Sequence, residues 1–242
     1  MKIVQITDIH LHKIADTRLC DVEINTDETL YWVLDKVKQE SPDLILATGD
    51  LSQDGSIESY QRLQIYFKKL PCNVYTIYGN HDDPANFDKY LLGGNIYKEP
   101  ILETDIGTFI FLNSHEYGSN SGYLDQKNQD HLIASLKKYD NCIIVIHHHF
   151  IFLNTFIDKY ILRNYQELLK IITIYKDKVK LCINGHVHNF YSNEFEGVKI
   201  YSSISTCLQF AKTPIMGIEK KSPGFTVYEF INDSYQVYEK II

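Results

Sequence analysis

The stretch Cys182-Ile183-Asn184-Gly185-His186-Val187-His188 is a short apolar run that ends in two histidines separated by a single residue. Four earlier apolar runs are also followed directly by residues of the kinds that bind metal ions. They are residues 2–7 before Asp8 and His10, 44–48 before Gly49-Asp50, 74–78 before Gly79-Asn80-His81, and 142–146 before His147-His148-His149. Such runs predict strands that are covered on both faces. Because open α/β sheets place their sites at the carboxyl ends of strands, we expect these residues to form one site.

The segments between these strands have the spacing of helices. Helices are expected over residues 28–40, 57–69, 83–92, 125–139 and 165–175, and Asn25-Thr26-Asp27 and Asp83-Pro84 supply residues that begin two of them. A hairpin is expected at 101–104 and 108–112, and further strands at 143–146, 179–183, 198–203, 225–230 and 235–241, with a turn at Asn232-Asp233. Strands alternating with helices, followed by a β-rich tail, predict one α/β layered domain over residues 1–242.

Composition and charge limit the classes of function. The chain has 242 residues, of which 44% are hydrophobic, and its formal net charge is −7. An acidic surface argues against nucleic acid or membranes as partners, although bound cations can still attract an anionic substrate. No apolar run approaches 18 residues and no signal-peptide pattern precedes the first strand, so we expect a cytoplasmic protein. Five scattered cysteines without a C-x-x-C pair fit free thiols in a reducing compartment.

Each candidate ligand on the first three strands has its own chemical reason. Asp8 and His10 can converge on one metal ion, and a carboxylate with an imidazole suits Mn, Fe, Zn, Co or Ni. Gly49 allows a sharp turn before Asp50, whose two carboxylate oxygens can bridge two cations. Asn80 offers a neutral carbonyl oxygen to a second ion. Each of these residues alone is more typical of an ordinary loop, so the prediction depends on their occurring together.

The remaining candidates are histidines and one carboxylate. In an extended segment His186 and His188 point the same way and can reach two adjacent metal ions. Three consecutive imidazoles at 147–149 cannot all face the core, so we expect at least one to be a ligand. His81 can hold a phosphate or protonate a leaving oxygen, and its alternative is a surface loop histidine. Asp82 can orient the His81 ring or help to cap the next helix, which is the slightly favoured interpretation. Together the five motifs predict a two-metal hydrolase.

The motif series as a whole resembles that of the calcineurin-like metallophosphoesterases. The matching motifs are, in order, Asp8-Ile9-His10, Gly49-Asp50, Gly79-Asn80-His81-Asp82, His147-His148-His149 and Gly185-His186-Val187-His188. Further segments resemble the bacterial class III cyclic nucleotide phosphodiesterases within that family. They are Gly49-Asp50-Leu51-Ser52-Gln53-Asp54, Ile161-Leu162-Arg163-Asn164, Ser205-Thr206-Cys207-Leu208-Gln209-Phe210 and Ser222-Pro223-Gly224-Phe225. The similarity covers nearly the whole chain.

The resemblance implies a four-layer αββα sandwich with mixed sheets, a β-rich C-terminal part and a dinuclear metal site. One metal ion would be held by Asp8, His10, Asp50 and His188, and the other by Asp50, Asn80, His186 and one histidine of the triple. In the family this histidine stands two residues before a proline. Phe150 occupies the proline position here, which points to His148 and leaves His147 and His149 as alternatives. Two further departures, Ile204 in place of proline and Asn113 in place of aspartate, affect no ligand but bear on loop shape and substrate preference.

The same resemblance implies a phosphodiesterase that converts a 3′,5′-cyclic nucleotide such as cAMP to the 5′-monophosphate. A hydroxide formed between two metal ions about 3.5–4 Å apart would attack phosphorus, with His81 and Asp82 as catalytic residues. His81, Arg163 and Asn164 would bind the substrate, although Arg163 is at least as typical of a solvated loop. Two divalent or mixed-valence ions are expected, with iron and manganese favoured and zinc, cobalt or nickel as alternatives.

Two rival functions remain. The same site can hydrolyse 2′,3′-cyclic nucleotides, glycerophosphodiesters or phosphomonoesters, because a fold does not fix a substrate. A non-catalytic protein-binding scaffold would be expected to have lost ligands, and all seven ligand positions are filled here. The 18 tyrosines fit a homodimer interface as well as an exposed surface, so the sequence leaves a homodimer open.

Overall fold

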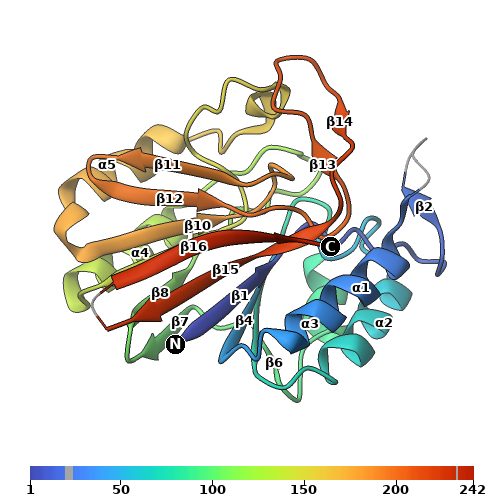
Figure 1. Ribbon diagram of the computed structural model, residues 1–242. Coiled ribbons are helices and arrows are strands. Elements are labelled where there is room, and N and C mark those ends of the chain that lie inside the picture. Colours follow the sequence, from blue (N-terminus) through green and yellow to red (C-terminus); the bar gives the residue numbers. More distant parts are fainter. Residues whose placement is uncertain (20–23, 233) are drawn as a thin grey trace.

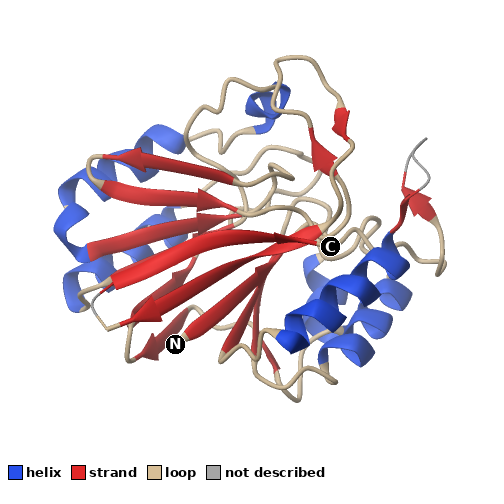
Figure 2. Ribbon diagram, in the orientation of Figure 1, coloured by secondary structure: helices blue, strands red, loops and turns tan. Residues whose placement is uncertain are grey.

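The protein is built from two six-stranded sheets that lie face to face between two layers of helices (Figures 1 and 2). The computed structural model describes residues 1–19, 24–232 and 234–242. Helices α1, α2 and α3 lie on the outer side of one sheet, and α4 and α5 lie on the outer side of the other (Figure 1). The four-layer αββα architecture expected from the sequence is thereby confirmed.

The first sheet carries the N-terminal strands. Its order is β16 (Ser234–Ile241), β15 (Gly224–Ile231), β1 (Lys2–Ile6), β4 (Leu44–Thr48), β5 (Val74–Ile77) and β6 (Ile96–Tyr97). The strands from β1 to β6 in this order are parallel, whereas β15 runs antiparallel to both β1 and β16. The covering helices are α1 (Thr26–Gln39), α2 (Ile57–Phe67) and α3 (Pro84–Tyr90). The carboxyl ends of the four parallel strands therefore lie at the same edge of the sheet.

The second sheet carries the later strands. Its order is β11 (Tyr191–Phe195), β12 (Val198–Ser202), β10 (Val179–Asn184), β9 (Cys142–Ile146), β8 (Gly107–Phe111) and β7 (Ile101–Thr104). The four central strands are parallel and the two edge strands are antiparallel to their neighbours. Helices α4 (Gln126–Lys138) and α5 (Tyr165–Ile174) cover it. Two smaller pairs complete the strands, β2 (Arg18–Leu19) with β3 (Ile24–Asn25) and β13 (Gln209–Phe210) with β14 (Ile218–Glu219).

The sheets stack because each central strand is apolar on both faces. Successive side chains of a strand point to opposite faces, so one strand contributes to two cores. In β1, Ile3 packs between the sheets while Val4 and Ile6 pack under the helices of the first layer. In β9, Ile143 packs between the sheets while Ile144 packs under α4 and α5. This is why the buried strands appear in the sequence as continuous apolar runs.

Local sequence explains where two helices begin. Asn25 caps α1 by accepting hydrogen bonds from the backbone N–H groups of Asp27 and Glu28, so the helix starts at Thr26, two residues earlier than expected. Asp83 caps α3 through the N–H of Asn86, with Pro84 as the first helical residue, as expected. Each cap fixes the direction in which the chain passes from the preceding loop into the helix.

Some expected features lie outside the described residues, and some observed elements were not expected. Cys20 and Asp233, the latter in the expected turn after Asn232, lie outside the described part of the chain. Cys72, Cys142, Cys182 and Cys207 are free, as expected. Strands β6, β11, β13 and β14 were not expected, and neither was the short 3-10 helix η1 (Phe156–Tyr160). Within the described residues, no helix combines the length and the apolar character needed to cross a membrane.

Candidate dinuclear metal site

The polar motifs follow the carboxyl ends of β1, β4, β5, β9 and β10, and the two sheets bring these ends together. The loops after β1 and β4 run side by side, because the N–H of Asp8 donates to the carbonyl of Gly49 at 3.0 Å and the N–H of His10 donates to the carbonyl of Asp50 at 3.0 Å. The loop after β5 joins them, since the N–H of His81 donates to Asp50 Oδ1 at 2.8 Å. The first sheet therefore delivers three motifs to one place.

Five residues of these motifs adopt the left-handed backbone conformation. Their φ angles are 53° at Asp8, 54° at His10, 51° at Asp50, 69° at His186 and 48° at His188. Residues other than glycine rarely occupy this region, and those that do gather at functional sites. The loops thus leave their strands by a sharp turn at the very residues that carry carboxylates and imidazoles.

Asp50 lies at the centre of the site. Its Oδ2 is 3.4 Å from His147 Nε2 and 3.8 Å from His10 Nε2. Its carboxylate belongs to two groups whose ligand atoms all lie within 4.8 Å of one another, His10 with Asp50 and His81, and Asp8 with Asp50 and His147. Gly79 packs so closely against Asp50 that a Cβ there would overlap the carboxylate. A carboxylate shared between two groups has the position needed to bridge two cations.

The second sheet closes the site through His186 and His188. The N–H of His186 donates to Asp8 Oδ2 at 3.0 Å. His188 Nε2 lies 3.4 Å from Asp8 Oδ1 and 3.1 Å from His10 Nε2. His10 Nδ1 is 2.7 Å from Gln53 Oε1, which makes Nδ1 the donor and leaves Nε2 of His10 as an acceptor. Two imidazole nitrogens and a carboxylate oxygen that face one point form a donor set suited to a transition metal ion.

Buried polar atoms without partners test whether the site fits metal ions. Among the described residues, four such atoms at the site are Asn80 Oδ1, His147 Nε2, His148 Nε2 and His186 Nε2. Buried polar atoms are nearly always hydrogen-bonded, so four orphans in one place call for a ligand that accepts their lone pairs. The ligand atoms of His147, His148 and His186 also lie within 4.8 Å of one another. The donor set therefore fits a second metal ion next to Asp50.

The three consecutive histidines have different partners. His147 Nδ1 lies 2.7 Å from the carbonyl of Thr48, and His148 Nδ1 lies 2.8 Å from Ser114 Oγ. A hydrogen bond at Nδ1 fixes the ring and leaves Nε2 free for a metal ion, so both residues are competent ligands. His149 instead places Nε2 at 3.3 Å from Asp158 Oδ1, in η1. Both ring nitrogens of His149 are also buried without a hydrogen bond, but among the described residues His149 belongs to none of the groups of ligand atoms that lie within 4.8 Å of one another, so His148 and His147 are the stronger candidates.

Burial controls the protonation of these groups. Burial, reinforced by neighbouring imidazoles, holds the pKa of both His148 and His186 well below the usual range. Burial likewise lowers the pKa of His10 to about 3. Burial alone would raise the pKa of the Asp50 carboxyl, but the nearby His147 and His81 outweigh it and lower that pKa well below its usual range. At two other histidines burial is outweighed by the carboxylates of Asp50 and Asp8, which raise the pKa of His147 to about 9 and that of His188 well above its usual range. Neutral imidazoles and ionised carboxylates are the forms that bind metal ions, so metal binding by these two histidines releases a proton.

Asp82, which the sequence predicts to be a catalytic residue, lies between two ligand-bearing loops. Its buried carboxylate accepts hydrogen bonds from the N–H groups of Gly79 at 2.8 Å and Ser52 at 3.0 Å, and from the hydroxyl of Tyr60 at 3.0 Å. It neither orients His81, whose Nδ1 lies 3.1 Å from the carbonyl of Gln53, nor caps α3. Burial and Asp50 raise the pKa of Asp82 to about 6. Asp82 is therefore a positioning residue that ties two ligand-bearing loops together.

Arg163 and Asn164, which the sequence places with the substrate, have their partners in loops of the second sheet. Arg163 forms an exposed ion pair with Glu116, which agrees with the alternative of a solvated loop residue. Asn164 bonds both ways to the backbone of Leu124, accepting from its N–H at 2.9 Å and donating to its carbonyl at 2.8 Å. Neither residue lines the cavity at the site. Both hold loops of the second sheet in place.

A cavity of about 240 Å³ opens at the site. One end is polar and is lined by His10, Asp50, Asn80, His81, His186 and His188. The other end is largely apolar and is lined by Leu19, Phe156, Ile157, Tyr160, Leu208, Phe210, Met216 and Ile218, with Lys159. Most of this second group comes from η1 and from the segment around β13 and β14. Leu208 and Phe210 lie in the segment 205–210 that resembles the class III enzymes, whereas the sequence did not single out η1, Met216 or Ile218. Their spacing follows neither a helix nor a strand, so periodicity gave no signal for them.

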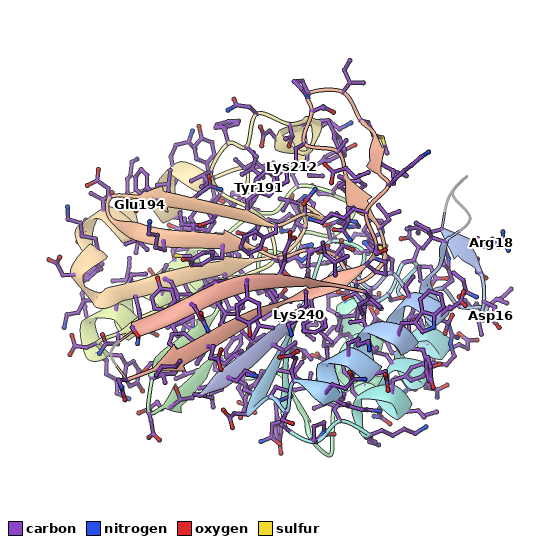
Figure 3. All side chains as sticks on the ribbon, in the orientation of Figure 1. Asp16, Arg18, Tyr191, Glu194, Lys212 and Lys240 are labelled. Carbon is purple, nitrogen blue, oxygen red and sulfur yellow. The ribbon has the colours of Figure 1, made fainter. Side chains whose placement is uncertain are left out.

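The segment between β13 and β14 is attached to the second sheet by side chains. The amino group of Lys212 lies 4.4 Å from the centre of the Tyr191 ring, at the start of β11 (Figure 3). The same amino group donates to the carbonyl of Phe190 at 2.6 Å. These contacts hold the segment over the cavity, beside the carboxyl ends of the strands.

The sequence matches the calcineurin-like phosphoesterase profile over residues 1–190. The chain belongs to this family. It is a hydrolytic enzyme, and enzymes of this family use a dinuclear metal site, to which the clusters of histidine and aspartate around Asp50 correspond. The non-catalytic scaffold, the less favoured of the two rival functions, is therefore set aside.

The chain is also similar to named relatives and to solved structures. It is 36% identical over 239 residues to a 3′,5′-cyclic-nucleotide phosphodiesterase of Nostoc, covering 96% of this chain and 89% of the relative. It is 32% identical over 250 residues to a 3′,5′-cyclic adenosine monophosphate phosphodiesterase of Haemophilus influenzae, covering 96% and 86%. A dimetal phosphatase from Danio rerio has the same fold, with a TM-score of 0.74 at 12% identity over 100% of this chain and 96% of that one.

Proposed function

We propose that this phosphoesterase hydrolyses a 3′,5′-cyclic nucleotide, such as cAMP, to the 5′-monophosphate. The observation that carries the proposal is the set of buried, unpartnered ligand atoms around Asp50, which opens directly into a small cavity. The names of the Nostoc and Haemophilus relatives, which align over nearly the whole chain, give the substrate class. The size of the cavity favours a small phosphodiester over a polymer.

We assign the ligands to two metal ions from the groups described above. Asp8, His10, Asp50 and His188 would hold one ion, and Asp50, Asn80, His186 and His148 the other, with Asp50 shared. His147 is the alternative to His148, because its Nε2 is also buried and unpartnered. When bound, the metal pair supplies positive charge for the phosphoryl oxygens and lowers the pKa of a water. Iron and manganese are the proposed metals, since mixed carboxylate, amide and imidazole ligands suit both.

His81 is the proposed catalytic acid. It lines the cavity beside Asp50, and its backbone N–H is fixed by the carboxylate of that residue. Its Nδ1 lies 3.1 Å from the carbonyl of Gln53, so Nδ1 donates there and Nε2 is left for the substrate. When its ring is protonated at both nitrogens, His81 can stabilise charge on the phosphoryl group and give the Nε2 proton to the departing ribose oxygen, while Nδ1–H stays bonded to Gln53.

The decisive test removes the shared carboxylate and the amide. Asp50→Ala and Asn80→Ala should each lower metal-dependent turnover of cAMP and of bis-p-nitrophenyl phosphate at least about 100-fold, since each removes a metal ligand. Asp105→Ala is the matched control, because Asp105 is an exposed carboxylate in the turn between β7 and β8. If Asp50→Ala kept wild-type turnover with Mn²⁺, the mechanism would be wrong.

A substrate panel tests the specificity. Purified protein would be assayed with 3′,5′-cAMP, 3′,5′-cGMP, 2′,3′-cyclic nucleotides, glycerophosphodiesters and phosphomonoesters, each with Mn²⁺, Fe²⁺ and Zn²⁺. The proposal expects 3′,5′-cyclic nucleotides to have the highest kcat/KM. Equal rates on all of these classes would reject it in favour of a general phosphoesterase. We also propose a cytoplasmic location, which the buried free thiols of Cys142, Cys182 and Cys207 support.

A further inference from the structure

The cavity has an apolar wall that the hydrolytic chemistry does not use. We define this wall by Phe156 and Tyr160 of η1, Phe210 of β13, and Met216 and Ile218 from the segment that ends in β14. Met216 is 65% exposed and Ile218 is 39% exposed. Apolar side chains that remain exposed at the mouth of a cavity beside converging polar groups are typical of a ligand site.

The wall is aromatic where it meets the metal site. The ring of Phe210 lies parallel to that of His188, with centroids 4.2 Å apart and planes 17° from each other. Phe156 meets Phe210 edge-on, with centroids 5.0 Å apart. The aromatic surface therefore begins at a proposed metal ligand and extends away from it. A flat group held against this wall would lie next to a phosphate at the polar end.

Lys159 adds a positive charge at the same place. Its amino group lies 4.6 Å from the centre of the Tyr160 ring and 5.9 Å from that of Phe156. It is the single lysine or arginine among the described residues that line the cavity, in a chain of net charge −7. A cation at the mouth attracts an anionic ligand into a site that an acidic surface would otherwise disfavour.

We propose that the apolar wall is the binding site for the nucleobase of a mononucleotide. The inference rests on the proposed function, and it deepens it by naming the group that gives the substrate its affinity. Nucleobases stack on aromatic side chains, whereas a glycerophosphodiester or a simple phosphomonoester has no flat ring to place there. At about 240 Å³ the cavity is close to the lower limit of the roughly 300–1,000 Å³ typical of small-molecule sites, so it suits a single mononucleotide better than a chain of nucleotides.

Binding of two product-like probes separates the two ends of the cavity. Adenosine 5′-monophosphate and ribose 5-phosphate carry the same phosphate and sugar, and they differ only in the base. Isothermal titration calorimetry with Mn²⁺-loaded protein should show that the wild type binds the monophosphate about tenfold more tightly, as expected for one stacked base. If the monophosphate binds no more tightly than ribose 5-phosphate, including no measurable binding of either, the proposal is overturned.

Variants of the wall locate the effect. Phe156→Leu and Phe210→Leu keep an apolar side chain but remove the ring, and each should weaken the monophosphate about fivefold while leaving ribose 5-phosphate unchanged. Phe156→Leu is the cleaner of the two, because Phe210 touches His188. Tyr117→Leu is the matched control, since Tyr117 is 90% exposed and does not line the cavity. If Phe156→Leu weakened the binding of adenosine 5′-monophosphate and of ribose 5-phosphate by the same factor, the result would contradict the proposal.

The outcome is independent of the catalytic assay. If the protein turned over bis-p-nitrophenyl phosphate but no cyclic nucleotide, and still preferred the monophosphate, the proposed function would fall and the nucleobase site would stand. If it hydrolysed cAMP but bound both probes equally, the nucleobase site would fall and the proposed function would stand.

Discussion

The polar end of the cavity and its apolar wall are built in different ways. The ligands of the polar end stand within a few residues of five strand ends, and backbone hydrogen bonds such as Asp8 N–H to the Gly49 carbonyl hold them. The wall comes from the loop segments 150–164 and 203–223. These are held by backbone hydrogen bonds, such as Phe210 N–H to the His188 carbonyl, and by side-chain contacts, such as Lys212 with Tyr191. The sheets therefore fix the chemistry, and separate loops shape the space around it. This difference predicts that variants at the two ends will change different kinetic constants.

The largest difference is expected between adjacent histidines. His148→Gln should lower kcat for cAMP at least about 100-fold, beyond the 10–100-fold typical of residues that only support a metal ligand. His149→Gln should lower kcat less than about tenfold, because the ring of His149 stacks on that of His186 but belongs to none of the groups of converging ligand atoms in the described part of the chain. Steady-state kinetics with Mn²⁺, including His147→Gln, would identify the ligand. If His148→Gln and His149→Gln lowered kcat for cAMP by the same factor, the result would contradict the division between the two ends of the cavity.

Removing the metal ions should lower the thermal stability of the protein through the polar end of the cavity. At metal concentrations 100-fold above Kd, binding stabilises a native protein by about 2.7 kcal/mol, which for a chain of this size is a Tm change of roughly 5–10 °C. Dialysis against EDTA should lower Tm by that amount, and Mn²⁺ should restore it. Asp50→Ala should show little response to Mn²⁺ in the same differential scanning calorimetry experiment, with Asp105→Ala as the responsive control. If neither EDTA nor Mn²⁺ changed the Tm, the result would argue against a metal site here.

Asp82 should matter more for stability than its neighbour Asp83. Asp82→Asn replaces one carboxylate oxygen by an NH2 group, which then faces the N–H of either Ser52 or Gly79, and leaving such a buried group unpaired costs about 1–3 kcal/mol. The expected fall in Tm is roughly 2–10 °C, measured by thermal unfolding of the metal-free protein. Asp83→Asn should be nearly neutral, because asparagine caps a helix as well as aspartate does. A larger loss in Asp83→Asn would show that the cap, not the loop junction, holds this region.

The smallest effect is expected at the junction between the wall and the second sheet. Asp158 accepts hydrogen bonds from the N–H groups of Leu153 and Thr155 and faces His149, so it positions η1. Asp158→Asn should raise KM for cAMP about three- to tenfold, as for the loss of about 1 kcal/mol, with kcat within about twofold. Asp177→Asn is the control, because Asp177 is an exposed acid in a second 3-10 helix, η2 (Lys176–Lys178). A fall in kcat without a change in KM would place Asp158 with the metal ligands instead.

The same contrast explains what could be predicted from the sequence. Strands buried on both faces are continuous apolar runs, so β1, β4, β5, β9 and β10 and the motifs that follow them were located correctly. Strand β11 was missed because it is an edge strand, Tyr-Ser-Asn-Glu-Phe, whose residues are at most half-buried. Order along the chain cannot show which side chains meet across long loops. For that reason Arg163 and Asn164 were placed with the substrate, although each is held by a loop partner.

The left-handed backbone at five of the site residues has a consequence for design. A residue other than glycine in this conformation costs roughly 1–2 kcal/mol, although aspartate and histidine tolerate it better than most. Across Asp8, His10, Asp50, His186 and His188 the sum is comparable with the total stability of an ordinary domain, about 5–15 kcal/mol. A sequence optimised only for folding would place glycine at these turns. Engineering this protein for heat resistance should therefore leave these five positions untouched, because there stability and catalysis require different residues.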